Sequence, residues 1–408
     1  MSEKTINKVP NVPNLRFVKY SDTIKKWRCS DFLNTFSTNS LSWDQLNYID
    51  KSDLKNLHYG LIHNGAPTLI DCDEYQLPFA QTEIKNYTLC NNGDVIFADA
   101  SEDTKDICKP VEFINISQEK VVSGLHTIHA RDIKDLTVIG FKGYLFSSYN
   151  FHKQVHRLTQ GTKIFSINPS NFKEMFVGIP SVEEQRDIVN LLSKIDKRIS
   201  TQNKIIDNLL SLMNGIRNII FSGDNNCFTN TTNNKLGYFL EEYSKKNIEN
   251  NLQSASIGKY GIRMRDEIYS KELTNDYSKN KVIFKDTLSI GMGSTQIDIG
   301  ILSENKEYCI SPAYTTYKIK NINSQYLNEY LIYLNPLLSK RYMIIGARQG
   351  KSVNKHELLE HEILIHSNEE QSKIVKIFNL LYAKLKKEKD ILSLYKKQKA
   401  YLLQNMFI

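Results

Sequence analysis

The sequence predicts an α+β protein in which two domains of related fold are separated by two long antiparallel coiled-coil helices, with a pseudo-twofold internal repeat. The main observation is a helical segment that occurs twice, from Ile179 to Phe221 and again from Ile365 to Phe407. Both ends are offset by 186 residues (365 − 179 and 407 − 221), so the two copies align without a gap. A large segment of different sequence precedes each copy. This arrangement indicates a duplicated scaffold that carries two divergent domains.

Each copy opens with a helix-capping signal. Ser181 is followed by Glu184, and Ser367 is followed by Glu370. In a capping box the serine hydroxyl accepts a hydrogen bond from a backbone N–H, and the glutamate reaches back to the N–H of the cap residue. We therefore expect a long helix to begin at each serine.

Apolar residues then follow at alternating steps of four and three, which is the seam of a helix packed along its length against another helix. Gln202 interrupts the first seam and Glu388 interrupts the second at the equivalent position, with Lys399 a further break. Two unrelated amphipathic helices would not explain why caps, seams and interruptions coincide, so we expect the helices to pack on each other. The seam residues are Ile188, Leu192, Ile195, Ile199, Ile206, Leu209, Met213, Ile216 and Ile220, and then Ile374, Phe378, Leu381, Leu385, Leu392, Tyr395, Leu402 and Met406.

The repeat divides the chain into a lead-in (1–23), a first insert (24–178), a first helical region (179–222), a second insert (223–364) and a second helical region (365–408). The second insert opens with a tract of Gly, Asn and Thr that predicts a turn-rich linker up to residue 234. Both inserts mix strand-like and helical runs, which predicts two α+β domains. The strand-like runs are Val95–Phe97, Val138–Phe141, Val282–Phe284 and Thr315–Ile319, and the clearest helical run is Tyr326–Leu338.

Composition excludes several classes of protein. A hydrophobic fraction of 40% supports folded cores, and a net charge of +8 with a pI of about 8.9 suits a polyanionic partner. The six cysteines are far apart in sequence, as in a reducing cytosol, and form neither a disulfide framework nor a zinc motif. The sequence shows no apolar run long enough for a membrane span and no signal peptide, so we expect a cytoplasmic protein.

Four stretches resemble the specificity (S) subunits of type I restriction–modification systems. They are Ile-Pro-Ser-x-Glu-Glu-Gln at 179–185, its degenerate partner at 365–371, Pro-Asn-Leu-Arg-Phe at 13–17 and Gly-Asp-Val-Ile-Phe at 93–97. The resemblance covers essentially the whole chain. The sequence departs from the family pattern in one place, because His366 in the second copy stands where the first copy has Pro180.

The resemblance implies a non-catalytic specificity subunit whose two inserts are target-recognition domains. Each would read one half of a bipartite, asymmetric site in double-stranded DNA. The helices would space these domains and dock methyltransferase subunits, two per specificity subunit, with restriction and translocase subunits joining through the complex. The assembled complex would be a DNA adenine methyltransferase and an ATP-dependent endonuclease, while this chain would need no cofactor. A free-standing bipartite DNA-binding regulator is the alternative.

Basic stretches in both inserts are the candidates for DNA contact. Arginine can bond to guanine O6 and N7, whereas lysine mostly meets phosphate. A solvated charged surface is the alternative for every one of them. The candidates are Lys105, Lys153, Arg157 and Lys163 in the first insert, and Lys259, Tyr260, Arg263, Arg265, Arg348 and Lys351 in the second.

Catalytic and metal-binding motifs are weak. Gly346–Ser352 resembles a phosphate-binding P-loop but has three residues between its glycines where the motif needs four, so a nucleotide hydrolase is only a third hypothesis. The Asn/Asp-Pro-Pro-aromatic motif of amino-methyltransferases is absent from the sequence. His126 with His129, and His152 with His156, have ligand-like spacing but no third ligand nearby. We interpret them as surface or loop histidines and expect no metal.

Overall fold

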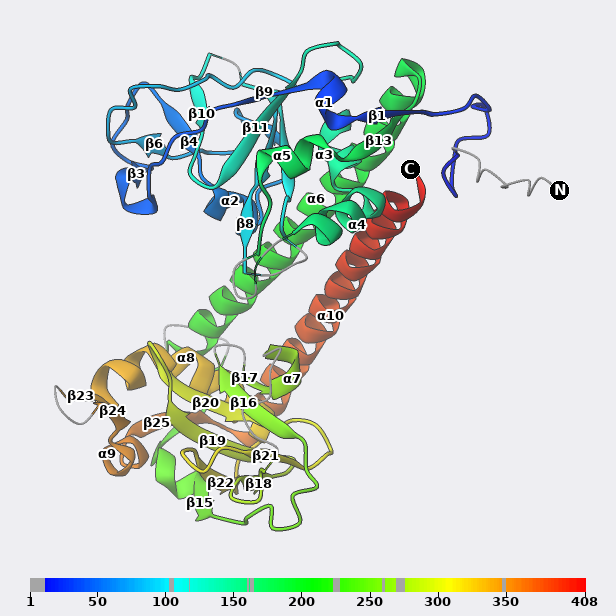
Figure 1. Ribbon diagram of the computed structural model, residues 1–408. Helices are drawn as coiled ribbons and strands as arrows, with labels where there is room; N and C mark the ends of the chain where they lie inside the picture. The colour runs from blue at the N-terminus through cyan, green and yellow to red at the C-terminus, as the bar shows by residue number, and fades with distance from the viewer. Residues whose placement is uncertain are drawn as a thin grey trace. The chain divides into compact units, whose positions relative to one another are not determined.

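The computed structural model describes residues 12–102, 106–116, 118–159, 161, 165–222, 228–258, 261–268, 276–346 and 350–408 (Figure 1). The chain forms two compact units. Unit 1 comprises Met1–Gln202 with Ile391–Ile408, and unit 2 comprises Asn203–Asp390. Each long helix therefore contributes one segment to each unit. Among the described residues, no helix has the length and apolarity needed to cross a membrane.

Unit 1 is built on a five-stranded and a four-stranded sheet (Figure 1). The first sheet has the order β2 (Leu33–Phe36), β11 (Thr127–Asp132), β7 (Val95–Ala98), β9 (Pro110–Asn115), β5 (Leu69–Asp71). The second has the order β10 (Val121–Ser123), β4 (Lys55–Leu57), β6 (Phe79–Ala80), β3 (Leu46–Asn47). Two strand pairs complete the unit: β1 (Lys25–Arg28) with β13 (Phe176–Ile179), and β8 (Ala100–Ser101) with β12 (Phe165–Ser166).

The helices of unit 1 cover these sheets and lead into the first long helix. They are α1 (Cys29–Phe32), the short 3-10 helix η1 (Trp43–Gln45), α2 (Tyr59–His63), α3 (Phe141–Phe146), α4 (Tyr149–Leu158), α5 (Pro169–Lys173) and α6 (Val182–Phe221). One buried apolar cluster joins the sheet to the long helices, because Phe97 and Phe141 share it with Leu192 of α6 and Met406 near the C-terminus.

Unit 2 contains two four-stranded sheets (Figure 1). The first sheet has the order β15 (Leu240–Tyr243), β22 (Thr315–Ile319), β19 (Thr287–Met292), β20 (Ile297–Ile301). The second has the order β17 (Gly261–Met264), β16 (Ser254–Gly258), β21 (Tyr308–Ile310), β18 (Lys281–Ile283). Strand pairs are β14 (Thr231–Lys235) with β25 (Glu362–His366), and β23 (Met343–Gly346) with β24 (Gly350–Val353). The helices are η2 (Leu236–Phe239), α7 (Arg265–Ile268), α8 (Ser324–Tyr342), α9 (Lys355–Leu359) and α10 (Asn368–Asn405).

The strand that leads into each long helix occupies the same place in its unit. β13 pairs antiparallel with β1 in unit 1, and β25 pairs antiparallel with β14 in unit 2. Adding the 186-residue offset to β13 (176–179) gives 362–365, which lies within β25. The same offset carries α5 (169–173) onto α9 (355–359). The internal repeat is therefore visible in the backbone as well as in the sequence.

The two long helices contact one another within each unit. In unit 1, Asp196 of α6 pairs with Lys399 of α10, and Arg198 lies over the ring of Tyr395, so later residues of α6 meet earlier residues of α10. In unit 2, Arg217 meets Tyr382, while Phe221 lies near His366. Within each unit the two segments thus run in opposite directions. Gln202 and Glu388 are each only 6% exposed, in keeping with the seam positions assigned to them.

Several local expectations are confirmed and two are wrong. Val95–Phe97 and Thr315–Ile319 fall on β7 and β22, and Tyr326–Leu338 falls inside α8. Val282–Phe284 overlaps β18, which ends one residue earlier, at Ile283. Val138–Phe141 is not a strand, because Gly140 adopts a left-handed conformation (φ 89°) and α3 begins at the next residue. The Gly/Asn/Thr tract is only partly a linker, because β14 begins at Thr231 and pairs with β25. Its residues 223–227 lie outside the described part of the chain.

Candidate nucleic-acid interface and its supports

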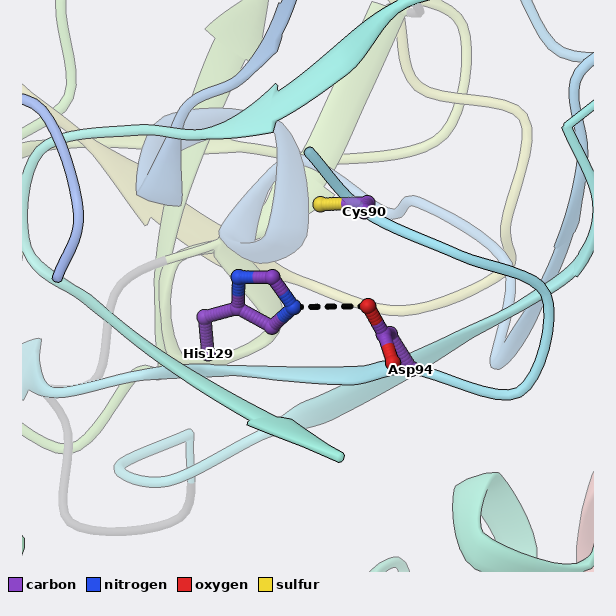
Figure 2. Close-up of side chains that lie close together, drawn as sticks. All are labelled: Cys90, Asp94 and His129. Carbon is purple, nitrogen blue, oxygen red and sulfur yellow. Dashed lines mark hydrogen bonds and ion pairs between the residues drawn. The ribbon is translucent and has the colours of Figure 1, made fainter. Parts of the chain in front are cut away.

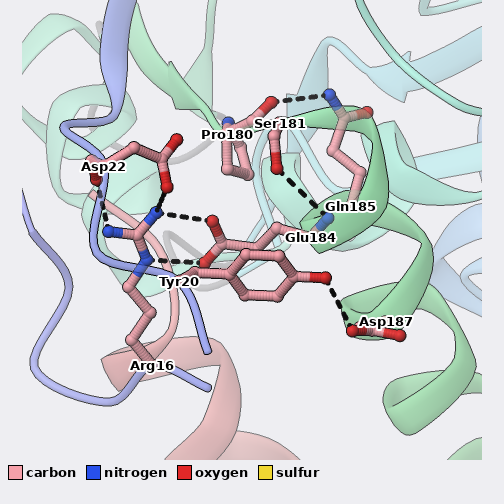
Figure 3. Close-up of polar contacts among 8 residues, drawn as sticks. All are labelled: Arg16, Tyr20, Asp22, Pro180, Ser181, Glu184, Gln185 and Asp187. Carbon is pink, nitrogen blue, oxygen red and sulfur yellow. Dashed lines mark hydrogen bonds and ion pairs between the residues drawn. The ribbon is translucent and has the colours of Figure 1, made fainter. Parts of the chain in front are cut away.

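Gln185 fixes the first insert to the start of α6. Its side chain is fully buried, and its amide oxygen accepts a hydrogen bond from the backbone N–H of Val138 at 2.9 Å. Its amide nitrogen donates to the carbonyl of Leu136 at 2.9 Å. It also donates to the carbonyl of Pro180 at 3.0 Å (Figure 3). A buried amide that satisfies three backbone groups holds its segment in one position, because each group would otherwise be desolvated without a partner.

Gln371 makes the corresponding contacts in unit 2. Its side chain is 3% exposed, and its amide oxygen accepts from the backbone N–H of Asn323 at 3.1 Å. Its amide nitrogen donates to the carbonyl of His366 at 2.8 Å. Both glutamines end the repeated Glu-Glu-Gln motif, so this residue type has a structural reason to recur. Sequence analysis placed the glutamines in the motif but did not assign them this role.

The capping boxes are confirmed only for the serines. Ser181 accepts from the N–H of Glu184, and Ser367 accepts from the N–H of Glu370, both at 3.4 Å. Neither glutamate accepts from the backbone N–H of its cap residue, although Glu370 accepts from the Ser367 hydroxyl at 3.2 Å. Glu184 forms a paired ion contact with Arg16 of the lead-in at 2.8 and 2.6 Å (Figure 3), while Glu370 accepts from the N–H of Thr229 at 3.1 Å.

The Arg16–Glu184 contact attaches the lead-in to the start of α6. Both side chains are buried, at 7% and 2% exposure. The hydrogen bond and negative charge of Glu184 raise the pKa of Arg16 further above its ordinary value, against the effect of burial. Arg16 lies in the Pro-Asn-Leu-Arg-Phe stretch that sequence analysis noted without assigning the arginine a partner.

Two predicted DNA contacts of the first insert lie together on α4. Lys153 and Arg157 are both exposed and are separated by four residues, which places them on one face of the helix. The opposite face is buried through Phe151 and Val155. Gln154 ties the helix to β13, since its amide donates to the carbonyl of Phe176 at 2.8 Å. The result is a basic face on a firmly anchored helix. Lys105 and Lys163 lie outside the described residues.

The candidates of the second insert are distributed over different elements. Arg263 is exposed on β17, and Arg265 opens α7 directly after it. Lys351 lies on β24 and donates to the carbonyl of Ser294 at 2.6 Å, so part of its hydrogen-bonding capacity is already used. Lys259, Tyr260 and Arg348 lie outside the described residues.

The P-loop-like segment has the wrong local structure for phosphate binding. A P-loop joins a strand to the N-terminus of a helix, where backbone N–H groups point at the ligand. Here β23 and β24 form an antiparallel pair, with Ile345 opposite Lys351, and residues 347–349 lie outside the described part. The hydrolase hypothesis therefore loses its one structural support.

His129 is not the surface histidine expected from the sequence. It is fully buried on β11, and its Nε2 lies 2.7 Å from Asp94 (Figure 2). Cys90 completes a group whose ligand-type atoms all lie within 4.8 Å of one another. However, Arg131 donates to both oxygens of Asp94 at 2.7 Å, so a guanidinium cation already neutralises the carboxylate.

Burial alone would raise the pKa of Asp94, yet hydrogen bonds from Arg131 and His129 outweigh it and hold the pKa below its ordinary value. Burial also raises the pKa of the Cys90 thiol well above its ordinary value, which disfavours the thiolate that a metal would need. We interpret the group as a buried ionic network that fixes β7 to β11.

Residues 76–211 match the family model described as the type I restriction modification DNA specificity domain. Within this segment the chain is similar to the DNA specificity domain of type I restriction–modification systems. The matched segment runs from the first insert into α6, so it includes both Gln185 and the basic face of α4. A search among curated proteins finds no significant match.

Two solved structures share the fold of this chain over almost its whole length. The type I restriction–modification S subunit from M. genitalium is 17% identical, with a TM-score of 0.52, and the match covers 97% of this chain and 99% of that one. A chain from a structure on complex assembly and conformational transition of the type I restriction–modification system is 15% identical, with a TM-score of 0.55 and coverage of 93% and 96%. At these identities the comparison concerns the fold alone.

Proposed function

We propose that this chain is a non-catalytic subunit that reads a bipartite, asymmetric site in double-stranded DNA, with one half-site assigned to each insert. On this proposal, residues 24–178 and 223–364 are two target-recognition domains of related fold, and residues 179–222 and 365–408 are the helical regions that space them. The observation that carries the proposal is the repeated attachment of each insert to its helix through Gln185 and Gln371, together with the family match on residues 76–211.

The basic positions supply the proposed DNA contacts. Lys153 and Arg157 present two cations on one exposed helix face, which suits the phosphates of a duplex. Arg263 is exposed on β17 and can reach a base edge, because arginine bonds to guanine through two parallel donors. The remaining proposed contacts are Lys105, Lys163, Lys259, Tyr260, Arg265, Arg348 and Lys351.

The outer faces of the long helices suit partner proteins. On α6, Ile205 and Leu212 are one heptad apart and are 40% and 53% exposed. On α10, Leu394 and Tyr401 have the same spacing and are 63% and 58% exposed. Apolar residues repeated every seven positions form a stripe that another helix can cover. We assign this role to two methyltransferase subunits, through which restriction and translocase subunits would join, in the cytoplasm.

The decisive experiment is a domain replacement read by sequencing. Cells carry this subunit with its methyltransferase partner, and single-molecule sequencing records methylated adenines. We expect a split, asymmetric motif. Replacing residues 24–178 with those of a relative should change one half of that motif and leave the other half unchanged. A change in both halves would contradict independent reading by the two inserts.

A free-standing DNA-binding regulator is the second candidate, favoured only by the basic surface. It would occupy its DNA site in cells that lack the methyltransferase and would leave the methylation pattern unchanged. Occupancy of the same DNA motif with and without the partner therefore separates the two functions. The purified chain alone should show neither methylation, nor cleavage, nor ATP hydrolysis.

A further inference from the structure

In unit 1, a partly buried polar network joins the first insert to both long helices, with Lys399 19% and Asp196 30% exposed. Tyr144 of α3 is fully buried, and its hydroxyl donates to Asp196 of α6 at 2.9 Å. Lys399 of α10 pairs with the other oxygen of Asp196 at 2.6 Å and donates to Thr68 at 3.1 Å. The insert thus supplies the phenol, α6 supplies the carboxylate and α10 supplies the cation.

Unit 2 contains a network of the same three kinds of group: a phenol, a carboxylate and a cation. Compared with unit 1, the phenol and the carboxylate are exchanged between the insert and the helix that follows it. Tyr382 of α10 donates to Glu329 of α8 at 2.8 Å. Arg217 of α6 donates to the other oxygen of Glu329 at 2.7 Å, and the two charged side chains are only 8% and 4% exposed. Here the insert supplies the carboxylate, and the helix that begins directly after it supplies the phenol.

The two networks occupy corresponding positions in the repeat. The reference points are Val138 and Asn323, whose backbone N–H groups donate to Gln185 and Gln371. Tyr144 lies six residues after Val138 (144 − 138), and Glu329 lies six residues after Asn323 (329 − 323). Asp196 and Tyr382 each lie eleven residues after those glutamines (196 − 185 and 382 − 371). Adding 186 to Arg217 gives 403, four residues from Lys399 and about one helical turn away.

We propose that this reciprocal exchange of carboxylate and phenol assigns each insert to its own pair of helix segments, so that the two inserts cannot exchange places in the chain. The matching depends only on these contacts. Its consequence, a fixed order of the two half-sites within the DNA motif, rests on the function proposed above.

Exchange of the inserts would create an unsatisfied network in both units. In the first position Glu329 would face Asp196, which leaves two carboxylates to share the single cation of Lys399. In the second position Tyr144 would face Tyr382, and Arg217 would lose its carboxylate partner. Like charges in contact and a buried unpaired charge both destabilise a fold strongly. Neither conflict arises in the natural order.

The first experiment exchanges the inserts in the full chain. One variant has residues 24–178 and 223–364 exchanged. A second variant also carries the pair Asp196→Tyr and Tyr382→Asp, which gives each helix the side chain that pairs with its new insert. We expect the pair to raise the thermal midpoint of the exchanged chain by about 5 °C or more and to lower that of the natural chain by a similar amount. An exchanged chain as stable as the natural chain, or a pair that destabilises both chains, would overturn the proposal.

A second experiment decides the matter if the exchanged chain does not fold. It uses Tyr144→Glu, Asp196→Tyr and the double variant in the natural chain, with Tyr149→Glu, an exposed position of α4, as the matched control. Each single change at the network should lower the thermal midpoint by about 5 °C or more, and the double variant should recover at least half of the summed loss. Additive losses in the double variant would overturn the matching. Since the readout is unfolding, its failure is distinct from a failure of DNA recognition.

Discussion

The side-chain oxygen of Gln185 lies 2.9 Å from the backbone nitrogen of Val138, 47 residues earlier in the chain. This hydrogen bond connects the segment just before α3 in the first insert to the first turn of α6. Its counterpart in unit 2 connects Gln371 to Asn323 at 3.1 Å. These two glutamines are thus repeated contacts that hold each insert to the helix that follows it.

Substitution of Gln185 should therefore destabilise unit 1. Gln185→Ala leaves the N–H of Val138 and two carbonyls without their partner in a buried setting, and we expect a loss of about 2–3 kcal/mol in the free energy of unfolding. Chemical denaturation followed by circular dichroism measures it. Gln398→Ala, at an exposed position of α10, is the control and should change stability by less than about 0.5 kcal/mol. Equal effects at the two positions would refute the role of Gln185.

The sequence predicted the long helices well because their apolar period and their serine caps are local signals. It could not predict the partner of Glu184, since Arg16 is distant in sequence (184 − 16 = 168 residues). The strand assignment of Val138–Phe141 failed for a similar reason. The run is apolar, but Gly140 turns the chain into α3, and Glu112 accepts from the N–H of Gly140 at 2.8 Å.

The sequence could predict the candidate DNA contacts as basic stretches, but it could not predict how their side chains are arranged in space. Periodicity alone does not say that Lys153 and Arg157 share an exposed helix face whose reverse is buried. Nor could spacing show that His129 is buried against Asp94, because that contact requires β7 and β11 to pair. Charged surface positions remain the part of a recognition protein that the sequence predicts least, because base choice depends on loop geometry.

His152 should make unit 1 sensitive to acid. Burial, with a smaller contribution from His156, lowers the pKa of His152 from 6.5 to about 4. The unfolded chain therefore takes up a proton near pH 6.5, whereas the folded chain does not until about pH 4. The contribution of neutral His152 to the free energy of unfolding is therefore complete above pH 6.5 and is lost as the pH falls from 6.5 to 4. The loss amounts to at most about 3 kcal/mol.

Replacing His152 with phenylalanine removes this titration and should flatten the dependence of stability on pH over the same interval. Denaturation midpoints at half-unit steps of pH measure the difference between the natural chain and His152→Phe. His156→Phe, at an exposed position of the same helix, is the control and should retain the acid sensitivity. Parallel pH curves for all three chains would show that His152 does not titrate in this interval.

The basic face of α4 should contribute salt-dependent affinity for DNA. A protein that neutralises a phosphate releases condensed counterions, and each contact adds about 0.9 to the slope of log affinity against log salt. Lys153→Ala and Arg157→Ala should each reduce that slope by about 1, with little change in the DNA motif. Binding of the assembled complex at several salt concentrations provides the measurement. Lys373→Ala, an exposed lysine paired with Glu369 on α10, is the control, and an equal reduction there would remove the assignment to α4.

The helices should act as a ruler for the distance between half-sites. Gln202 marks the boundary between the segments of α6 that belong to units 1 and 2. Inserting four residues beside it lengthens the helix by at most about 6 Å, at 1.5 Å per residue. Four residues also form the stutter that a heptad seam absorbs by local unwinding, without reversing its buried face.

At roughly 3.4 Å per base pair, the gap between the two half-sites should widen by about one to two base pairs. Both half-site sequences should stay unchanged, because the insertion leaves the inserts and their glutamine contacts intact. The methylated motif of the insertion variant, read by sequencing in cells with the methyltransferase, measures the gap. The variant must first show methylation, which establishes that it assembles. An active variant with the original gap would show that the spacing is set elsewhere than by the length of α6.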